Sequence, residues 1–380
     1  MTSTMSPVVV VLNCGSSSIK FALFEAGTTP LPRTPLWGGK VEGLSSGEAY
    51  HQALDDIRAR ILARLEGRPI AAIAHRVVHG GARYAEPVRV DAAVLVDLKS
   101  FIPLAPLHQP FALEAIAVLL EARPDLPQIA CFDTAFHHTL PLVEQILPLP
   151  YSAWERGLRR YGFHGLSYEY LAVVLPERHG ALARGRTLVA HLGSGASLCA
   201  MQDLQSVATT MGFSALDGLM MGTRCGALDP GAVLYLMEVE KLSVEQLGHL
   251  LYHESGLLGL SGVSADPRAL LAQETGNPRV QAALDLYVRR IVREIGAMVA
   301  VLGGLDLLVF TAGVGEHNAE IRARICRGLG FLGLVLDEAA NAGHAATISN
   351  TESRVRVAVE PTNEEWIAAR DALACLNKPS

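Results

Sequence analysis

A chain of 380 residues exceeds what one hydrophobic core usually supports, so the length predicts two domains. Half of the residues are hydrophobic and 18% are charged, a composition that excludes a disordered chain and indicates a well-buried α/β protein. The formal net charge is -6 and the basic residues are scattered. This argues against a nucleic-acid partner, because such a surface needs clustered positive charge.

Cysteine usage and hydropathy predict the compartment. The six cysteines include no CxxC pair, so we expect reduced thiols in a reducing compartment. No basic segment precedes the short first apolar run, and we therefore expect no signal peptide. The longest uncharged stretch, residues 295–305, is shorter than the ~20 residues of a membrane span. These features predict a cytoplasmic protein without a membrane partner.

The chain opens on two predicted strands, residues 8–12 and 19–24, joined by the segment NCGSSS (13–18). A tight hairpin normally uses Asn-Gly or Gly-Asn and needs no row of hydroxyl groups. Glycine followed by three serines leaves N–H and O–H donors exposed, and such a turn suits an anion, most often phosphate. A serine-rich turn without a ligand is the alternative.

Helical and strand patterns alternate along the rest of the chain. Helices are predicted at 53–65, 111–123, 280–302 and 318–329, and strands at 71–78, 128–132 and 305–311. This alternation indicates α/β domains with mostly parallel strands. Proline-rich breaks occur at 30–35, 103–110 and 141–150, and we expect the domain junction near the last of them.

The plan of the opening hairpin occurs a second time. Residues 187–203 again read as an apolar strand, a polar residue, a glycine-rich turn and a second strand. Superposing Gly15 on Gly193 also places Asn13 on His191. Two similar hairpins half a chain apart predict two related domains, each contributing one loop to a shared cleft. Coincidence is the alternative, since Gly/Ser turns between strands are common.

Familiar phosphate loops are absent, but one segment could hold a nucleotide. The chain has no GxxxxGK[ST] motif and no GxGxxG after its first strand. In 308–316 a buried strand runs into Gly313-Val314-Gly315 and a helix, which brings N–H groups and a helix N-terminus to the strand end. A close-packed strand-to-helix turn is the alternative.

Three charged side chains lie beside glycines. Arg76 ends a predicted strand just before two glycines, and its guanidinium needs either an anionic ligand or a structural ion pair. His164 and Arg224 lie in the glycine-flanked segments GFHG and GTRCG. Two arginines and a histidine are what phosphoryl transfer requires, because cations and a hydrogen-bond donor must stabilise the charge of the moving group.

These segments together resemble the acetate kinase family, and the resemblance covers nearly the whole chain. The matching segments are NCGSSSIKF (13–21), HRVVHGG (75–81), LAPLH (104–108), CFDTAFH (131–137), RYGFHGLS (160–167), HLGSGAS (191–197), MGFSALDGLMMGTRCGALDP (211–230), FTAGVGEH (310–317) and PTNEEWIAARD (361–371). Nine segments in the right order are far more specific than any one of them.

The resemblance implies two ribonuclease-H-like α/β domains that flank a nucleotide cleft, the actin-like ATPase fold. Residues 1–145 would form the first domain, completed by the C-terminal helix at 365–380. Residues 146–364 would form the second domain, which binds nucleotide and joins two chains into a homodimer.

The family resemblance further implies the reaction and its residues. The activity would be a reversible transfer of phosphate from ATP to acetate, giving ADP and acetyl phosphate, with Mg²⁺ or in its place Mn²⁺. Asn13 and Glu364 would help to hold the metal. The residues implied for catalysis are Arg76, Asp133, His164 and Arg224, and those implied for the acyl group are Arg76, Val78, Leu107 and Phe163. The residues implied for the nucleotide are Ser16, Ser18, Lys20, His191, Gly193, Ser194, Gly195, Asp266, Arg268, Gly313, Val314, Gly315, Glu316 and His317.

The chemistry of the substrate bears on Asp133. A carboxylic acid with a pKa of about 4 is already ionised at pH 7, so an acetate-phosphorylating enzyme needs no general base. Asp133 is then better interpreted as an organiser of metal or water. A relative that phosphorylates a hydroxyl group would need this residue as a base.

Three positions depart from the family pattern. Ser194 replaces the usual asparagine of HLGNG, which removes an amide near the phosphates. Ala215 replaces a proline at the edge of the acyl pocket and predicts a slightly roomier pocket, in which propionate would also fit. Pro267 replaces an aromatic residue of the adenosine region and would loosen base selectivity.

Two alternative functions follow from these observations. A propionate kinase would differ only in the acyl pocket, where one methylene is worth ~1–3 kcal/mol. A nucleotide switch of the actin or chaperone type would share the fold, but it would not need Arg76, Arg224 and His164 at one point.

Overall fold

The structure is a computed structural model that describes residues 5–15, 18–43, 47–106 and 108–378. The backbone packs into two units. The first unit contains Met1–His138, Gly165–Tyr170 and Asn363–Ser380, and the second contains Thr139–His164 and Leu171–Thr362. The domain boundary that the sequence places at 145 stays a prediction.

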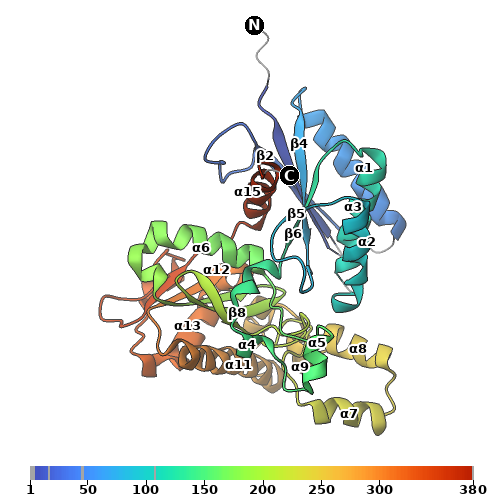
Figure 1. Cartoon of the computed structure of the whole chain (residues 1–380). Coiled ribbons are helices and arrows are strands. Elements are labelled where there is room, and N and C mark those ends of the chain that lie inside the picture. The colour runs from blue at the N-terminus through green and yellow to red at the C-terminus, as the bar shows by residue number, and fades with distance from the viewer. Residues whose placement is uncertain (1–4, 16–17, 44–46, 107, 379–380) are drawn as a thin grey trace. The chain divides into compact units, whose positions relative to one another are not determined.

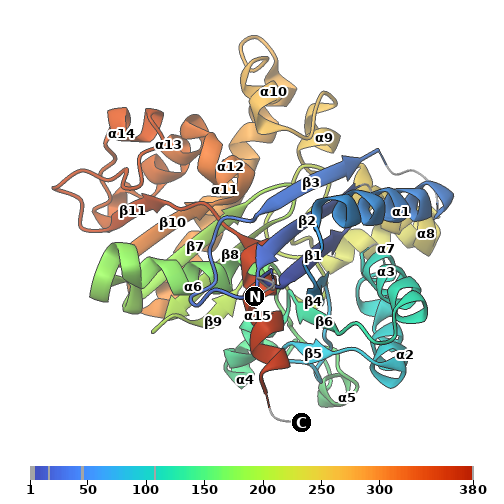
Figure 2. The same cartoon turned by 90° about the horizontal axis from the view of Figure 1, so that it is seen from above.

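The first unit is built on a six-stranded sheet with the order β3-β2-β1-β4-β6-β5 (Figure 2). Its strands are β1 (Val8–Cys14), β2 (Ser18–Glu25), β3 (Trp37–Glu42), β4 (Ile70–Val77), β5 (Val88–Arg89) and β6 (Gln128–Phe132). The neighbours β1, β4 and β6 run parallel, whereas β2 is antiparallel to both β1 and β3. The carboxyl ends of β1, β4 and β6 therefore meet at one edge of the sheet.

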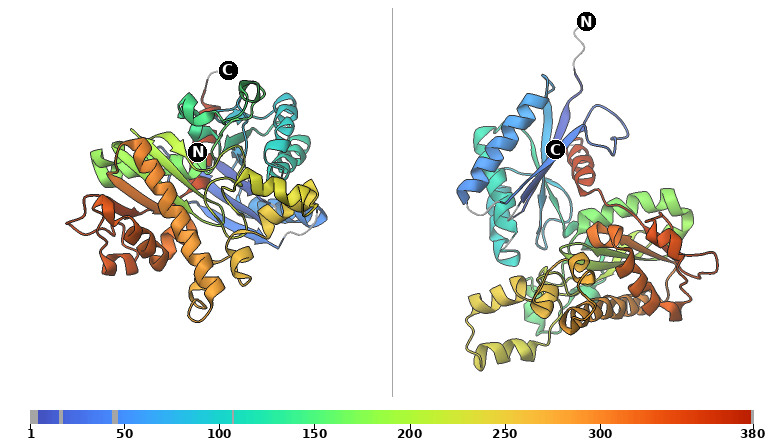
Figure 3. Two further views of the ribbon diagram at one scale, coloured as in Figure 1. Left: turned by 90° about the horizontal axis from the view of Figure 1, so that it is seen from below. Right: turned by 180° about the vertical axis from the view of Figure 1, so that it is seen from behind.

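Helices cover both faces of this sheet, which is why its central strands are apolar throughout. The helices are α1 (Gly47–Arg64), α2 (Ala92–Ser100), α3 (Gln109–Ala122) and α15 (Glu364–Leu376), with short 3₁₀ turns at Ile102–Leu104 and Ala135–Thr139. Figures 1 and 3 show α1 and α3 on one face and α15 on the other. The four valines that begin β1 are all buried, as expected of a strand covered on both faces.

The second unit repeats this topology. Its sheet has the order β11-β10-β7-β8-β9, with β7 antiparallel to β8 and parallel to β10. The strands are β7 (Arg186–Leu192), β8 (Ala196–Gln202), β9 (Gln205–Thr209), β10 (Leu307–Thr311) and β11 (Arg356–Val359). Read as β9-β8-β7-β10-β11, they match β3-β2-β1-β4-β6 in order and direction. The duplication predicted from the two hairpins is confirmed.

Helices also cover both faces of the second sheet. In Figures 1 and 3, α11 lies on one face and the part of α6 beyond Tyr170 on the other. The helices are α4 (Leu142–Gln145), α5 (Tyr151–Glu155), α6 (Gly165–His179), α7 (Pro230–Glu238), α8 (Val244–His253), α9 (Gly256–Ser261), α10 (Pro267–Leu271), α11 (Pro278–Leu302), α12 (Ala312–His317), α13 (Ala319–Gly328) and α14 (Glu338–Ala342). Short 3₁₀ turns lie at Gly180–Arg184 and Gly330–Leu332.

Most elements predicted from the sequence are present. The strand at 128–132 is β6, and the helix at 280–302 is α11. The helix predicted from residue 53 begins earlier, at Gly47, and the strand predicted from residue 305 begins at Leu307. Asp306, just before that strand, instead binds Arg186 through both carboxylate oxygens. Among the described residues, no helix has the length and apolar character needed to cross a bilayer.

An ion cluster in the first unit joins the start of α6 to α15. Arg370 on α15 pairs with its neighbour Asp371 at 2.7 Å and with Glu169 on α6. Burial, reinforced by the charge of Asp371, raises the pKa of Glu169 to about 7, and Arg370 opposes this increase. One buried and one partly buried carboxyl group thus share one guanidinium.

This cluster predicts an unusual dependence of stability on pH. The pKa of Glu169 rises from 4.5 to about 7 on folding, so its contribution to stability is complete below pH 4.5 and is lost as the pH rises through 7. Glu169→Gln cannot titrate, and its free energy of unfolding relative to wild type should increase over that interval. Urea unfolding of both proteins across this range would measure the difference.

Glu274→Gln is the matched control. Its hydrogen bond with Arg324 lowers the pKa of Glu274, so this carboxylate stabilises the fold above its ordinary pKa. Glu274→Gln should therefore lose stability relative to wild type as the pH rises through the acid range. A pH-independent difference between Glu169→Gln and wild type would contradict the interpretation of the cluster.

Candidate active site

Three strand ends place polar side chains together in the first unit. Asn13 lies near the end of β1, Arg76 near the end of β4, and Asp133 directly after β6. These three strands are parallel neighbours, so their carboxyl ends form one edge of the sheet. Ligands of α/β proteins typically bind beyond this edge. Glu364, the first residue of α15, joins the group.

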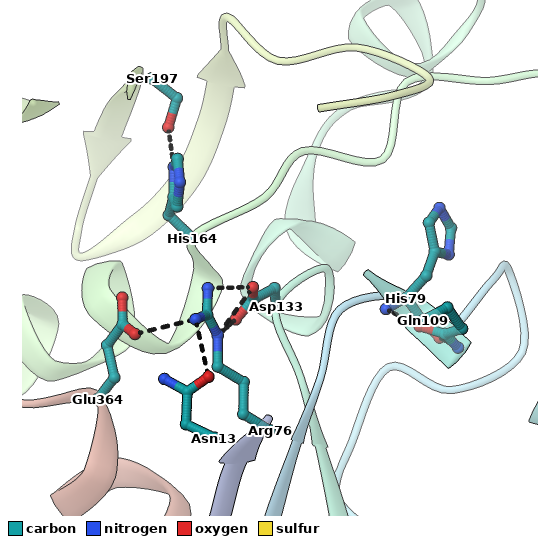
Figure 4. A network of polar contacts seen from close by, with 8 residues as sticks. All are labelled: Asn13, Arg76, His79, Gln109, Asp133, His164, Ser197 and Glu364. Carbon is teal, nitrogen blue, oxygen red and sulfur yellow. Dashed lines mark hydrogen bonds and ion pairs between the residues drawn. The ribbon is translucent and has the colours of Figure 1, made fainter. Parts of the chain in front are cut away.

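The Arg76 guanidinium is the centre of this group (Figure 4). Its Nε and Nη2 donate to the two carboxylate oxygens of Asp133 at 2.9 and 2.7 Å. Its Nη1 donates to Asn13 Oδ1 at 3.2 Å and lies 3.6 Å from Glu364 Oε2. The alternatives left open for Arg76 are thus partly resolved: a structural ion pair is present, and it is bidentate.

Burial and charge act against each other in this network. Burial raises the pKa of the Asp133 carboxyl, and the Arg76 guanidinium opposes that increase. Burial lowers the pKa of Arg76, but Asp133 and Glu364 raise it by more, so the net shift is upward. Both oxygens of Asp133 are engaged by a permanent cation, which disfavours a role as general base.

The network carries an excess of one negative charge, from two carboxylates and one guanidinium. Among the described residues, no cluster of three His, Cys, Asp or Glu side chains could hold a metal alone. The Asn13 amide oxygen and the Glu364 carboxylate are hard oxygen donors, and Mg²⁺ usually takes one or two such protein ligands together with substrate phosphates. The donor set therefore fits a magnesium ion shared with a ligand.

In the second unit, His164 has a constrained position. It precedes α6 with a left-handed φ of 60°, an uncommon conformation for a residue other than glycine. Its Nδ1 lies 2.8 Å from the hydroxyl oxygen of Ser197 on β8 (Figure 4). Its ring stacks on that of His191, with centroids 4.1 Å apart. These contacts fix the ring, and its Nε2 lies next to Gly195 of the β7–β8 turn.

The β7–β8 turn passes directly against two of the predicted catalytic groups. A Cβ atom on Gly195 would lie 2.9 Å from His164 Nε2 and 3.6 Å from Arg224 Nη1. A Cβ atom on Gly193 would lie 3.7 Å from His191 Nε2. His164, His191 and Arg224 thus converge on the turn that the sequence predicts to bind phosphate.

Arg224 differs from Arg76 in its partners. Its Nη1 donates to the carbonyl oxygen of Ala215 at 3.0 Å and lies 3.6 Å from the sulfur of Met221. Among the described residues, no carboxylate contributes to its electrostatics. Burial lowers the pKa of its guanidinium. A half-buried cation without a carboxylate partner is well suited to receive an anionic group.

A cavity of about 430 Å³ adjoins the same turn. It is lined by Gly193, Ser194, Gly222, Thr223, Leu257, Ala265, Asp266, Pro267, Arg268, Tyr287, Gly313, Val314 and His317. The structure therefore brings seven of the predicted nucleotide-binding residues to one cavity. Asp266 and Arg268 form an ion pair there, with three side-chain oxygen–nitrogen contacts of 2.7, 3.1 and 3.2 Å.

Gly315 and Glu316 are among the predicted nucleotide-binding residues that do not line this cavity. Gly315 packs against Phe310, and its carbonyl oxygen accepts from Arg322. Glu316 accepts a hydrogen bond from the backbone N–H of Ala312 at 2.9 Å, which stabilises the first turn of α12.

Some lining residues were not predicted. Gly222 and Thr223 directly precede Arg224, so the glycine-rich segment could have indicated them. Leu257 and Tyr287 belong to the apolar faces of α9 and α11, and nothing in the sequence distinguishes them from ordinary core residues.

The remaining predicted residues occupy varied positions. Ser18 begins β2, and its carbonyl oxygen accepts from Gly15 N–H at 2.9 Å. Lys20 is exposed and lies opposite Asn13 in the β1–β2 ladder. Val78 is half-buried just beyond β4, and Phe163 is buried beside His164. Ser16 and Leu107 lie outside the described residues.

The amino-acid sequence is similar to those of acetate kinases. The sequence pattern of the Acetokinase family matches residues 8–370. An acetate kinase of Rhodopseudomonas palustris is 50% identical over 390 aligned positions, which cover 96% of this chain and 98% of that protein. An acetate kinase of Methylocella silvestris is 46% identical over 402 positions, with coverage of 98% and 99%.

Solved structures agree with these relatives. The crystal structure of Porphyromonas gingivalis acetate kinase has a TM-score of 0.86 at 35% identity, covering 98% of this chain and 100% of that one. A propionate kinase from Francisella tularensis has a TM-score of 0.86 at 33% identity, covering 96% and 98%. The family resemblance and the actin-like ATPase fold expected from the sequence are confirmed.

The close approach of the turn to His164 yields a direct prediction. Gly195 does not have a left-handed φ, so alanine is compatible with its backbone, but the added Cβ would displace His164 Nε2. We expect Gly195→Ala to fold normally and to lower phosphoryl transfer by about 100-fold, the loss typical of one transition-state hydrogen-bond donor.

The matched control is Gly296→Ala in α11, where an added Cβ meets nothing within 4 Å. Steady-state rates and thermal unfolding of both variants check the prediction. Equal rates in Gly195→Ala and Gly296→Ala would contradict the placement of His164 at the reacting group.

Proposed function

Because the chain belongs to the acetokinase family, we propose that it catalyses the reversible transfer of the γ-phosphoryl group of ATP to acetate, giving ADP and acetyl phosphate. One observation supports this most strongly. His164 and Arg224 converge on Gly195, in a turn whose Gly193 and Ser194 line a 430 Å³ cavity. A nucleotide in that cavity could present its phosphates to an imidazole and to a cation without a carboxylate partner.

The transfer requires no proton movement. An oxygen of the acetate carboxylate forms a bond to the γ-phosphorus, while the bond from that phosphorus to the β,γ-bridging oxygen breaks and its electron pair stays on ADP. Acetate is already ionised at pH 7, so no base is needed. The enzyme must overcome repulsion between two anions, which makes positioning and charge neutralisation the main catalytic terms.

The side chains divide this work. We assign Arg224 and Arg76 to the acetate carboxylate and the transferring phosphoryl group, and His164 Nε2 to a hydrogen bond with that group in the transition state. Ser197 holds the opposite nitrogen of the ring, Nδ1, at 2.8 Å and so orients it. Asp133 positions Arg76 through both carboxylate oxygens. These groups stabilise charge and form no covalent intermediate.

Mg²⁺ accompanies the nucleotide in this proposal. Asn13 Oδ1 and Glu364 would hold it, with Asp133 nearby, because their oxygens match the preference of the ion. The bound ion would neutralise charge on the phosphate oxygens. Mn²⁺ accepts the same oxygen ligands and could replace it.

The acyl pocket decides between acetate and propionate. We assign Val78, Leu107 and Phe163 to the methyl group. Ala215 contributes its backbone carbonyl to Arg224, a contact that does not depend on the side chain at this position. We therefore expect acetate to remain the preferred substrate and propionate to be a weaker one.

Hydroxylamine trapping of acyl phosphate tests this function directly. With MgATP and acetate, propionate or butyrate, kcat/KM should be highest for acetate. A clear preference for propionate would make the enzyme a propionate kinase with the same mechanism. Bound or slowly hydrolysed ATP without any acyl phosphate would instead support a nucleotide switch.

Substitution of Arg224 tests its proposed role in catalysis. Arg224→Met should nearly abolish turnover, because it removes a cation that stabilises the transition state, while ATP still binds in the adjoining cavity. Arg293→Met is the control, since Arg293 is an exposed side chain of the same unit that pairs with its neighbour Glu294. Calorimetric ATP binding and the trapping assay would separate the two effects. Unchanged turnover in Arg224→Met would refute the assignment.

We also propose a cytoplasmic homodimer. All six cysteines are free, as expected of a reducing compartment. Exposed apolar side chains gather on and around α7 and α8, a surface that favours a protein partner: Leu228, Leu234, Tyr235, Val239 and Val244.

Charge on this surface should separate the subunits. Tyr235→Asp combined with Val239→Asp places two carboxylates in the apolar patch and should shift the molar mass measured by light scattering from dimer to monomer. Val96→Asp, on an exposed position of α2, is the control and should leave the mass unchanged. A dimer that survives the double substitution would exclude this surface.

A further inference from the structure

The segment that follows β4 is held by a side chain outside the residues assigned to catalysis. β4 ends at Val77, and Val78 and His79 continue the chain without a neighbouring strand in the ladder. His79 is fully buried, with 0% of its surface exposed. Its backbone N–H and C=O therefore need partners other than a strand.

Gln109 supplies both partners (Figure 4). Its Oε1 accepts from the His79 N–H at 3.0 Å, and its Nε2 donates to the His79 carbonyl oxygen at 2.9 Å. The carboxamide thus reproduces the two bonds that a paired strand would make. Gln109 is itself 0% exposed, so water does not compete for either bond.

The rest of this contact is rigid. Gln109 is the first residue of α3, and its own N–H donates to the carbonyl oxygen of Ala105 at 2.9 Å. Further along α3, Leu113 and Ile116 pack in the core with Val77 at the end of β4. The carboxamide therefore joins the Val78–His79 backbone to a helix that is already fixed to the sheet.

We propose that Gln109 is a positioning residue that sets the acyl chain length the enzyme accepts. By holding the backbone of His79, it fixes the side chain of the adjacent Val78, which is assigned to the wall of the acyl pocket. A wall held in place in this way disfavours the extra methylene of propionate. This inference rests on the proposed function, because it concerns discrimination between two carboxylic acids.

The chain offers a matched control for the loss of a buried amide. Gln128 on β6 is 1% exposed, and its Oε1 lies 2.9 Å from Nε2 of His75 on β4. Its partner is a side chain, so its removal leaves the His79 backbone untouched. Gln128→Met and Gln109→Met are therefore comparable in burial and polarity, but only the second releases the segment that carries Val78.

The experiment compares kcat and KM for acetate, propionate and ATP in wild type, Gln109→Met, Gln109→Asn and Gln128→Met. In Gln109→Met, the ratio of kcat/KM for acetate to that for propionate should fall by about fivefold or more, within the roughly 10- to 200-fold that one methylene can carry. The change should come mainly from KM of the acids. KM for ATP should stay constant, because the nucleotide cavity belongs to the second unit.

Gln109→Asn retains the amide on a shorter side chain and should give an intermediate ratio. If Gln109→Met does not fold, the ratio measured for Gln109→Asn tests the proposal instead. A purely structural role would lower the active fraction and leave the ratio unchanged. The proposal is overturned by a wild-type ratio in the folded Gln109 variants, or by an equal change in Gln128→Met. Wild-type enzyme without any acyl phosphate would refute the proposed function instead.

Discussion

The bidentate pair between Arg76 and Asp133 is the interaction on which the first unit's site depends. A charge at a buried strand end is tolerated only with a well-placed partner, and removing one member of such a pair costs about 3–5 kcal/mol. The parallel order of β1, β4 and β6 supplies that geometry, because it brings Asn13, Arg76 and Asp133 to one edge. The same pair occupies both oxygens of Asp133. The fold thus places this contact, and the contact in turn disfavours Asp133 as a general base.

The second unit has the same sheet topology but a different arrangement of charged side chains. Its corresponding hairpin, β7–β8, has a turn that passes close to two side chains, because a Cβ atom on Gly195 would lie 2.9 Å from His164 Nε2 and 3.6 Å from Arg224 Nη1. Arg224 has no carboxylate partner among the described residues, so its charge is available to a ligand. The duplicated fold therefore carries two arginines in different states: Arg76 is paired with a carboxylate, and Arg224 has no such partner among the described residues.

The sequence predicted the duplicated α/β fold because strand and helix periodicity and the two Gly/Ser hairpins are local features. Glycine flanks also indicated Arg76, His164 and Arg224. The sequence could not predict that Arg76 pairs with Asp133, since 57 positions separate the two residues and an anionic ligand was the other candidate partner. Tyr287 and Leu257 line the 430 Å³ cavity from helices whose apolar residues look like ordinary core residues. The role of the Gln109 carboxamide could not be predicted either, because it binds backbone groups of His79 and no side-chain pattern in the sequence indicates such a contact.

The central claim is that these side chains only position and neutralise two anions, without a covalent phosphoenzyme. The stereochemical course at phosphorus tests it most directly, with a γ-phosphoryl group made chiral by oxygen isotopes. A single in-line transfer to acetate predicts inversion of configuration in the acetyl phosphate formed. Retention would require two successive transfers through a protein nucleophile, and it would contradict this account.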